Sequence, residues 1–308
     1  MRTTFGSFNI ATSGLFASQR SLDTTSHNIS NANTEGYSRQ ITKQRASMPT
    51  YGDPTGVVGT GVETYDIIRI RSSYLDAKYW GQNKTYREWS VKQAQLESLE
   101  GVFNEPSDTG IRIVMDEFFT ALEALSKHAG DSSCRVNVIE KANMLTTTIN
   151  RNGYELINSI RDVNFSIKNK VSQVNSLTEQ IANLNKHIFS FELGGNKAND
   201  LRDQRNLLLD ELSSIVNITV TELPGPNGNN YMDVKLGGIT LINHINYNKL
   251  ATVDEPGEFT ELGSGKISRI VWEGLDNQEV SIGGGELRGL LDVRDGNGEN
   301  HSYRGIPY

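Results

Sequence analysis

The sequence predicts an α+β protein with an N-terminal coiled-coil helix, a domain of long bundled helices and then a small antiparallel β domain. Apolar residues recur every seven positions before residue 40 and again between 73 and 216, a spacing typical of helices that pack on other helices. After residue 217 the apolar period changes to two, which is typical of short strands. Glycine and proline interrupt both patterns between 41 and 72, where we expect an extended linker.

Composition excludes several classes of protein. The 30 Lys and Arg against 37 Asp and Glu leave a net charge of -7, which argues against nucleic acid or an acidic membrane as the main partner. One cysteine, Cys134, rules out an intrachain disulfide and a thiol metal cluster. The apolar runs are too short and too charged to span a bilayer. The first residues also lack the apolar core of a cleaved secretion signal.

Catalytic and metal-binding patterns are missing from the sequence. The five His are scattered, and none stands at the spacing of metal ligands. Gly56, Gly59 and Gly61 resemble a phosphate loop only superficially, since no Lys-Ser/Thr follows them. The acids and bases of "DLRDQR", 200–205, fit a solvated helix face with salt bridges. We therefore expect a protein that is not an enzyme and uses neither cofactor nor metal.

The first forty residues read as a heptad helix and a polar turn. Phe8, Leu15, Leu22 and Ile29 are seven apart, and small residues interleave at 11, 18, 25 and 32. This seam is buried only where another helix covers it; an ordinary domain helix is the alternative. The helix then ends in "HNISNANTEGYSRQ", 27–40, where Gly36 can take a positive φ.

Four helices are expected in the next domain. The first, from about 73 to 101, carries an apolar and aromatic heptad series that we expect in the core. A shorter helix begins near 111, and a long one runs from about 132 to 191 with Gly153 as its weak point. The last opens with Asp200 and Asp203 in the positions of a capping pair. The heptad series of the first helix consists of Leu75, Tyr79, Gln82, Tyr86, Trp89, Leu96 and Phe103.

The rest of the chain is expected to be mostly strands. Between 217 and 283 we count five or six short strands joined by Gly, Asn and Pro turns, the last of them "QEVSI". A helix from Glu286 to Val293 follows, and the sequence stops soon after it. The predicted parts are thus a heptad helix and turn (1–40), a linker with short strands (41–72), a long-helix bundle (73–216), a β-rich domain (217–283) and the start of a further helical segment (284–308).

The turn resembles a signature of bacterial flagellar axial proteins, in which an amphipathic helix ends in an Asn-rich turn. Asn28, Ile29, Asn31, Ala32, Asn33, Thr34, Gly36 and Tyr37 carry it. "YSRQ", "GVVGTGVE", "DLRDQRNLLLDELSSIVNI" and "GGELRGLLDVRDG" are similar to the hook-associated protein 1 family and follow in the expected order. Chains of that family continue past residue 308, so the sequence is either an N-terminal portion or a short member.

The resemblance implies a structural subunit that joins hook and filament by helical self-assembly, outside the cell, after export without a cleaved signal. Residues 1–40 would form an inner axial segment, and 217–283 would face outward. Implied partners are further copies, the hook protein, the second hook-associated junction protein and an export chaperone bound through a C-terminal part. Neither nucleic acid nor membrane is expected.

Subunit contacts are expected from the heptad helix and its turn. For Tyr37, Arg39 and Gln40 the alternative is that they only order the turn. A different function stays open as well: an adhesin or ligand-binding module built on 217–283, which an exposed aromatic patch with Trp272 or Tyr231 would favour. The residues expected at subunit contacts are Phe8, Leu15, Leu22, Ile29, Asn28, Asn31, Asn33, Gly36, Tyr37, Arg39 and Gln40.

Overall fold

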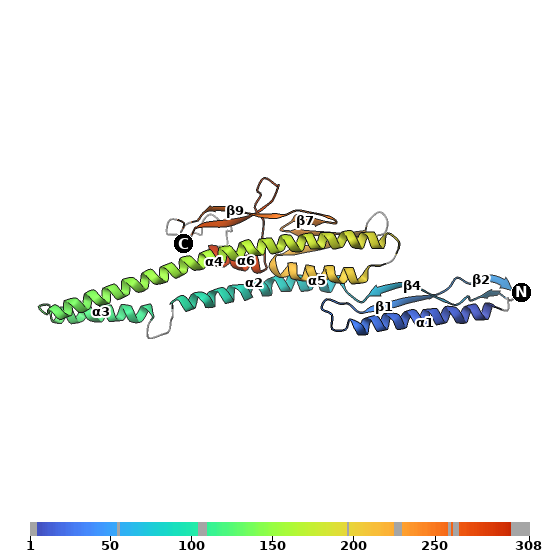
Figure 1. Ribbon diagram of the computed structural model, residues 1–308, viewed down its shortest axis with the longest axis horizontal. Coiled ribbons are helices and arrows are strands. Elements are labelled where there is room, and N and C mark those ends of the chain that lie inside the picture. Colours follow the sequence, from blue (N-terminus) through green and yellow to red (C-terminus); the bar gives the residue numbers. More distant parts are fainter. Residues whose placement is uncertain are drawn as a thin grey trace. The chain divides into compact units, whose positions relative to one another are not determined.

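The computed structural model divides the chain into two compact units (Figure 1). The first consists of Met1–Gly81, Ser176–Ser213 and Ile218–Asn248, and the second of Gln82–Asn175, Ser214–Asn217 and Lys249–Tyr308. The structure describes residues 5–53, 56–103, 110–195, 197–224, 230–257, 260 and 265–296. The end of the predicted segment 284–308 therefore lies outside the described residues.

In the first unit, helix α1 (Gly6–Ser30) runs alongside a hairpin of strands β1 (Gln40–Ala46) and β4 (Val62–Arg69) (Figure 1). The strands are antiparallel, and Gln40 stands opposite Arg69 at the base of the hairpin. Strands β2 (Thr50–Asp53) and β3 (Gly56–Val58) form a second, smaller pair. The linker, predicted to carry short strands, holds four of them in the described residues, and "QITKQRA" pairs with "VETYDIIR" despite its weak apolar alternation.

The same unit contains helix α5 (Asn199–Ile215), the end of helix α4 (Ser132–Glu192) and a four-stranded antiparallel sheet. Apolar residues of the two helices and the sheet are buried there. Among them, Ile181 and Ile188 are seven apart, the apolar spacing expected between 73 and 216. The strands, in sheet order, are β5 (Ile218–Pro224), β6 (Asn230–Leu236), β7 (Ile239–Asn243) and β8 (Asn246–Tyr247). Buried members of this core include Ile181, Ile188, Leu209, Leu212, Val234, Leu241 and Ile242.

The second unit holds α3 (Ile111–Lys127), which lies alongside the first part of α4 and is joined to it by the Lys141–Glu117 ion pair at 2.8 Å (Figure 1). Strands β9 (Leu250–Pro256) and β10 (Lys266–Trp272) pair antiparallel. The predicted strand "QEVSI" is wrong, since only an isolated bridge joins it to β10. The core of this unit includes Ile167, Val174, Ile270, Trp272 and Leu287.

Helix α2 (Ser73–Phe103) corrects one expectation. Its aromatic series does not lie in the core: Tyr86 is 68% and Trp89 60% exposed, and the other apolar members of the series are exposed too. In the second unit another side of α2 faces α6 (Glu286–Asp295), with Val91 next to Gly289. Lys92, whose ammonium group also lies over the Trp89 ring, forms a 2.6 Å ion pair with Asp292. The heptad period marks one face of the helix as apolar, but the described residues leave that face uncovered.

The long helix α4 gives a first prediction. A Cβ added to Gly153 would meet nothing within 4 Å, so alanine costs no space and removes the backbone freedom that glycine has in the unfolded chain. We expect Gly153→Ala to raise the free energy of unfolding by about 0.5–1 kcal/mol, measured by urea denaturation. A loss of stability would show that α4 bends or is unwound at this position.

Among the helices in the described ranges, none combines the length and the apolar character that a membrane span requires.

Candidate functional site

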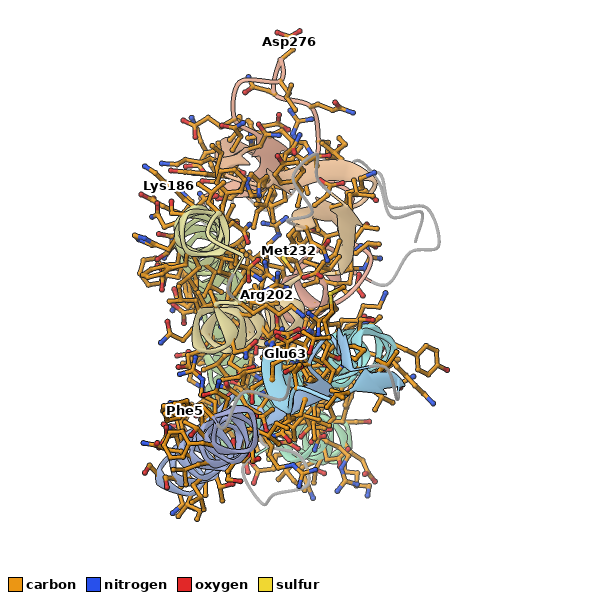
Figure 2. All side chains as sticks on the ribbon, turned by 90° about the vertical axis from the view of Figure 1, so that its right-hand side faces the viewer. Phe5, Glu63, Lys186, Arg202, Met232 and Asp276 are labelled. Carbon is orange, nitrogen blue, oxygen red and sulfur yellow. The ribbon has the colours of Figure 1, made fainter. Side chains whose placement is uncertain are left out.

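Helix α1 presents its heptad face to solvent. Phe8, Leu15, Leu22 and Ile29 are between 67% and 72% exposed, and the small residues of the interleaved row are exposed as well. Figure 2 labels Phe5, the residue just before α1, and Glu63 on the hairpin, and side chains project from α1 away from that hairpin. The residues of the predicted seam are therefore exposed along α1, and Ala32 follows just after the helix ends. We call this row the open face of α1: Phe8, Ala11, Leu15, Ser18, Leu22, Thr25, Ile29 and Ala32.

The opposite side of α1 explains why the seam is open. Ala17 and Thr24 are the buried residues of the helix, and the contacts with the hairpin are small and polar. Ser21 shares a 3.0 Å hydrogen bond with Thr42, and Gln44 donates to the Ala17 carbonyl at 3.2 Å. The helix is thus held by its polar side, and its large apolar side chains are left for another partner. Single exposed apolar residues are common on protein surfaces. A row of large apolar residues at heptad spacing is instead typical of a helix that packs on another helix.

The turn after α1 is organised by Asn28. Its side-chain oxygen accepts from the Gln40 backbone N–H at 2.9 Å and from the Tyr37 hydroxyl at 2.8 Å, while its amide donates to the Gln40 carbonyl at 2.9 Å. The amide supplies the donor and the acceptor on two separate atoms, and both are used here. Burial and the nearby carboxylates of Asp200 and Asp203 raise the pKa of Tyr37, which keeps its hydroxyl protonated as the donor to Asn28.

The other side of this turn rests on α5. Gln40 donates to Asp200 at 2.7 Å, and Asn199 donates to the Gln40 side chain at 3.2 Å. Asp203 accepts from the Ser38 backbone N–H at 2.9 Å and from Arg69 at 2.7 Å. We call this network the joint, and it consists of Asn28, Ser38, Gln40, Arg69, Asn199, Asp200 and Asp203.

Two expectations about "DLRDQR" are wrong. Asp200 and Asp203 do not act as a capping pair, because their carboxylates bind the turn and the hairpin instead. The segment is also not a solvated face, since Asp203 is 4% and Arg205 2% exposed. Arg205 donates to Glu222 at 2.7 Å and to Asn185 at 3.1 Å, and burial lowers its pKa to about 10. These charges are buried because the turn and the sheet cover α5.

The residues predicted for subunit contacts fall into three places. The open face of α1 holds the four apolar ones. Asn28, Tyr37 and Gln40 take part in hydrogen bonds within the chain, Gly36 has φ 78° beside Leu207, and Asn31 donates to the His27 carbonyl. Asn33 and Arg39 are exposed. The predicted positive φ at Gly36 is confirmed, whereas contact with another chain stays a prediction for all of them.

Near the joint, α5 also holds the end of α4. Glu192 accepts two hydrogen bonds of 2.7 Å from Arg202 and one of 3.1 Å from the Ala198 backbone. Burial by itself would raise the pKa of Glu192, but these hydrogen bonds outweigh it and hold the pKa below its ordinary value of 4.5. The folded pKa is lower than the unfolded one, so the ion pair stabilises the fold above about pH 4.5 and is lost as the pH falls through the folded pKa.

The lowered pKa of Glu192 gives a second prediction. Glu192→Gln should lower the free energy of unfolding by about 2 kcal/mol near pH 7, and it should flatten the loss of stability that acid causes in the parent chain. Urea unfolding at several pH values between about 3 and 7 measures both effects. An unchanged acid slope in the variant would show that other carboxylates carry that slope.

The exposed aromatic patch that would favour a binding module on 217–283 is not formed by Trp272 or Tyr231. Trp272 is 0% exposed. Tyr231 is half-buried, with its ring 4.4 Å from that of His244 and 6.2 Å from that of Phe189. The two aromatic residues therefore form no exposed patch. Within the described ranges, moreover, no three His, Cys, Asp or Glu side chains are placed to hold a metal ion.

Two protein-family models match this chain. The family model for the flagellar hook-associated protein FlgK helical domain matches residues 96–302. The model for the flagella basal body rod protein matches residues 8–37, which include most of α1 and the turn.

Relatives and a solved structure agree with these matches. Flagellar hook-associated protein 1 of Bacillus subtilis is 36% identical over 72% of this chain and 45% of its own length. The protein of that name from Salmonella typhimurium is 30% identical over 93% of this chain and 51% of its own. The chain thus spans about half the length of these relatives. The flagellar hook junction protein FlgK from Burkholderia pseudomallei superposes with a TM-score of 0.58 at 27% identity, covering 73% of this chain and 39% of that one.

The two family matches together reach from α1 to α6, and the helical-domain match alone covers more than half of the chain. The α+β architecture, with its long helix and small antiparallel sheets, agrees with the FlgK structure. This chain belongs to the flagellar hook-associated protein FlgK family.

Proposed function

We propose that the chain is part of a structural, non-enzymatic subunit of the bacterial flagellum, which forms the junction between hook and filament by helical self-assembly. The open face of α1 carries this proposal. Four large apolar side chains at heptad spacing, each exposed by 67% or more, need a helical partner to be buried. The relatives named as hook-associated proteins and the rod-protein match over the same residues support an axial partner.

The proposed partners follow the resemblance. They are further copies of the subunit, the hook protein, the second hook-associated junction protein and an export chaperone that binds the remainder of the full-length product. The subunit would reach the outside of the cell without a cleaved signal. Residues 1–40 would be its inner axial segment, and the β-rich region 217–283 would face outward.

Within residues 1–40 the two kinds of exposed residue suggest different roles. The apolar residues of the open face would form the helix contact, where removal of each side chain from water contributes about 1.5–3 kcal/mol. Asn33 and Arg39, exposed at the turn, would lie at the polar rim of that contact. The buried members of the joint would support the contact without touching the partner.

The experiment uses the full-length product and purified polymerised hooks. Sedimentation and electron microscopy would measure whether the protein coats hook ends, with a variant lacking residues 1–40 beside it. We expect binding to the ends that is lost in the deletion. A protein that ignored hook ends, or whose deletion variant still bound them, would contradict the proposal.

A further inference from the structure

We infer that Asp203 is a positioning residue that fixes the direction in which α1 and the β1–β4 hairpin leave α5. The effect of Asp203 on assembly rests on the proposed function. Its effect on the geometry of the first unit is independent of that function. The observation is that one carboxylate on α5 holds both strands at the base of the hairpin. Asp203 binds Ser38, just before β1, and Arg69, the last residue of β4.

The chemistry of this contact makes it directional. A carboxylate has two oxygens, and here each oxygen accepts from a different donor: the Ser38 backbone N–H and the Arg69 guanidinium. Hydrogen bonds to charged groups are short and angle-dependent, and the aspartate side chain is itself short. The two donors are therefore fixed relative to the backbone of α5, and with them the base of the hairpin, where Gln40 and Arg69 are paired.

Burial separates Asp203 from Asp200, the other carboxylate of the joint. The Asp203 side chain is 5% exposed and the Arg69 side chain 13%, whereas that of Asp200 is 59% exposed. Water can replace a lost partner of Asp200. It cannot easily replace Asp203, whose removal leaves a backbone N–H and a guanidinium buried without an acceptor.

The position of the hairpin also determines that of α1. Asn28 ties the end of the helix to Gln40, and Ser13 accepts from the Val62 backbone N–H at 3.2 Å further along. Helix and hairpin therefore move together, and the open face turns with them. Subunits of one assembly must present a contact surface in the same direction, so a loosened joint should spread the directions of the open face while leaving that face intact.

The test measures this spread in the unassembled chain. Spin labels are placed at two exposed positions, Ser18→Cys on α1 and Gln204→Cys on α5, in a Cys134→Ser background. We expect a narrow distance distribution in the parent and one at least twice as wide in Asp203→Ala. Asp203→Asn keeps an acceptor for Ser38 but loses the charge that faces Arg69, so we expect an intermediate width.

The matched control is Arg202→Gln on the same helix, labelled in Figure 2. It breaks the buried pair with Glu192, whose side chain is 6% exposed, without touching the turn or the hairpin. We expect it to lower the unfolding midpoint as Asp203→Asn does and to leave the distance distribution narrow. Distributions for both Asp203 variants as narrow as that of Arg202→Gln would overturn the inference.

Binding to hook ends then tests the consequence for assembly. At matched stability, Asp203→Asn should bind hook ends at least tenfold more weakly than Arg202→Gln. A widened distribution with equal hook binding by these two variants would overturn the consequence for assembly and leave the positioning role standing. If deletion of residues 1–40 fails to abolish hook binding, the proposed function fails while the distance measurement still decides the role of Asp203.

Discussion

Replacing Leu15 and Leu22 together with serine is expected to weaken binding of the full-length product to hook ends by about a thousandfold. The free energy of unfolding should stay within about 0.5 kcal/mol of the parent, because both side chains are 67% exposed and lie outside the core of the unit. Burial of a leucine in a helix interface contributes about 2 kcal/mol. Two such losses give about 4 kcal/mol, which corresponds to an about thousandfold weaker affinity.

The control for this prediction is Leu193→Ser. Leu193 is 58% exposed, which is close to the exposure of the two leucines on α1, but it lies just after α4. We expect that variant to bind hook ends like the parent. Equal weakening by Leu193→Ser and by the α1 variant would mean that general surface hydrophobicity drives binding, and the open face would lose its special role.

Replacing Gly285 with alanine is expected to lower the free energy of unfolding by about 3 kcal/mol. Gly285 precedes α6 with φ 89°, a backbone region that residues with a Cβ rarely adopt. A Cβ at this position would also clash with the carbonyl oxygen of Ile215. The backbone N–H of Gly285 donates to Lys84 at 3.1 Å, so the residue cannot move without losing that hydrogen bond.

Gly153→Ala serves as the control for this change, since it makes the same substitution where nothing lies within 4 Å. Urea unfolding of the two variants should therefore give effects of opposite sign. Equal and small effects would mean that the chain around Gly285 adjusts freely. In that case the family-like "GGELRG" stretch would have no packing reason for its glycine at this position.

The sequence predicted those parts of the fold that depend on local period. The seven-residue spacing of Ile167, Val174, Ile181 and Ile188 places them on one side of a long helix, and all four are buried in α4. The open face of α1 was equally readable, because its spacing is regular whether or not a partner is present. The six strands from β5 to β10 match the expected number but not the expected set, because "QEVSI" forms only an isolated bridge.

Other features depend on contacts that no local pattern reveals. Asp203 is bound by Arg69 and Ser38, which are 134 and 165 positions away in the chain, so the acids of "DLRDQR" look like a surface pattern until the fold brings those donors to them. For Trp89 the local pattern is visible but misleading. Its spacing marks an apolar helix face and predicts burial, whereas in the structure Trp89 is 60% exposed and α6 packs on another side of α2.

The most direct test of the central claim is the reactivity of a cysteine placed on the open face of α1. Leu22→Cys in a Cys134→Ser background would be labelled with a maleimide in the free full-length product and after its assembly on hook ends. The account predicts rapid labelling in the free protein, because position 22 is 67% exposed, and at least tenfold protection in the assembled protein. Equal labelling rates in the two states would contradict the claim that this face is buried by assembly.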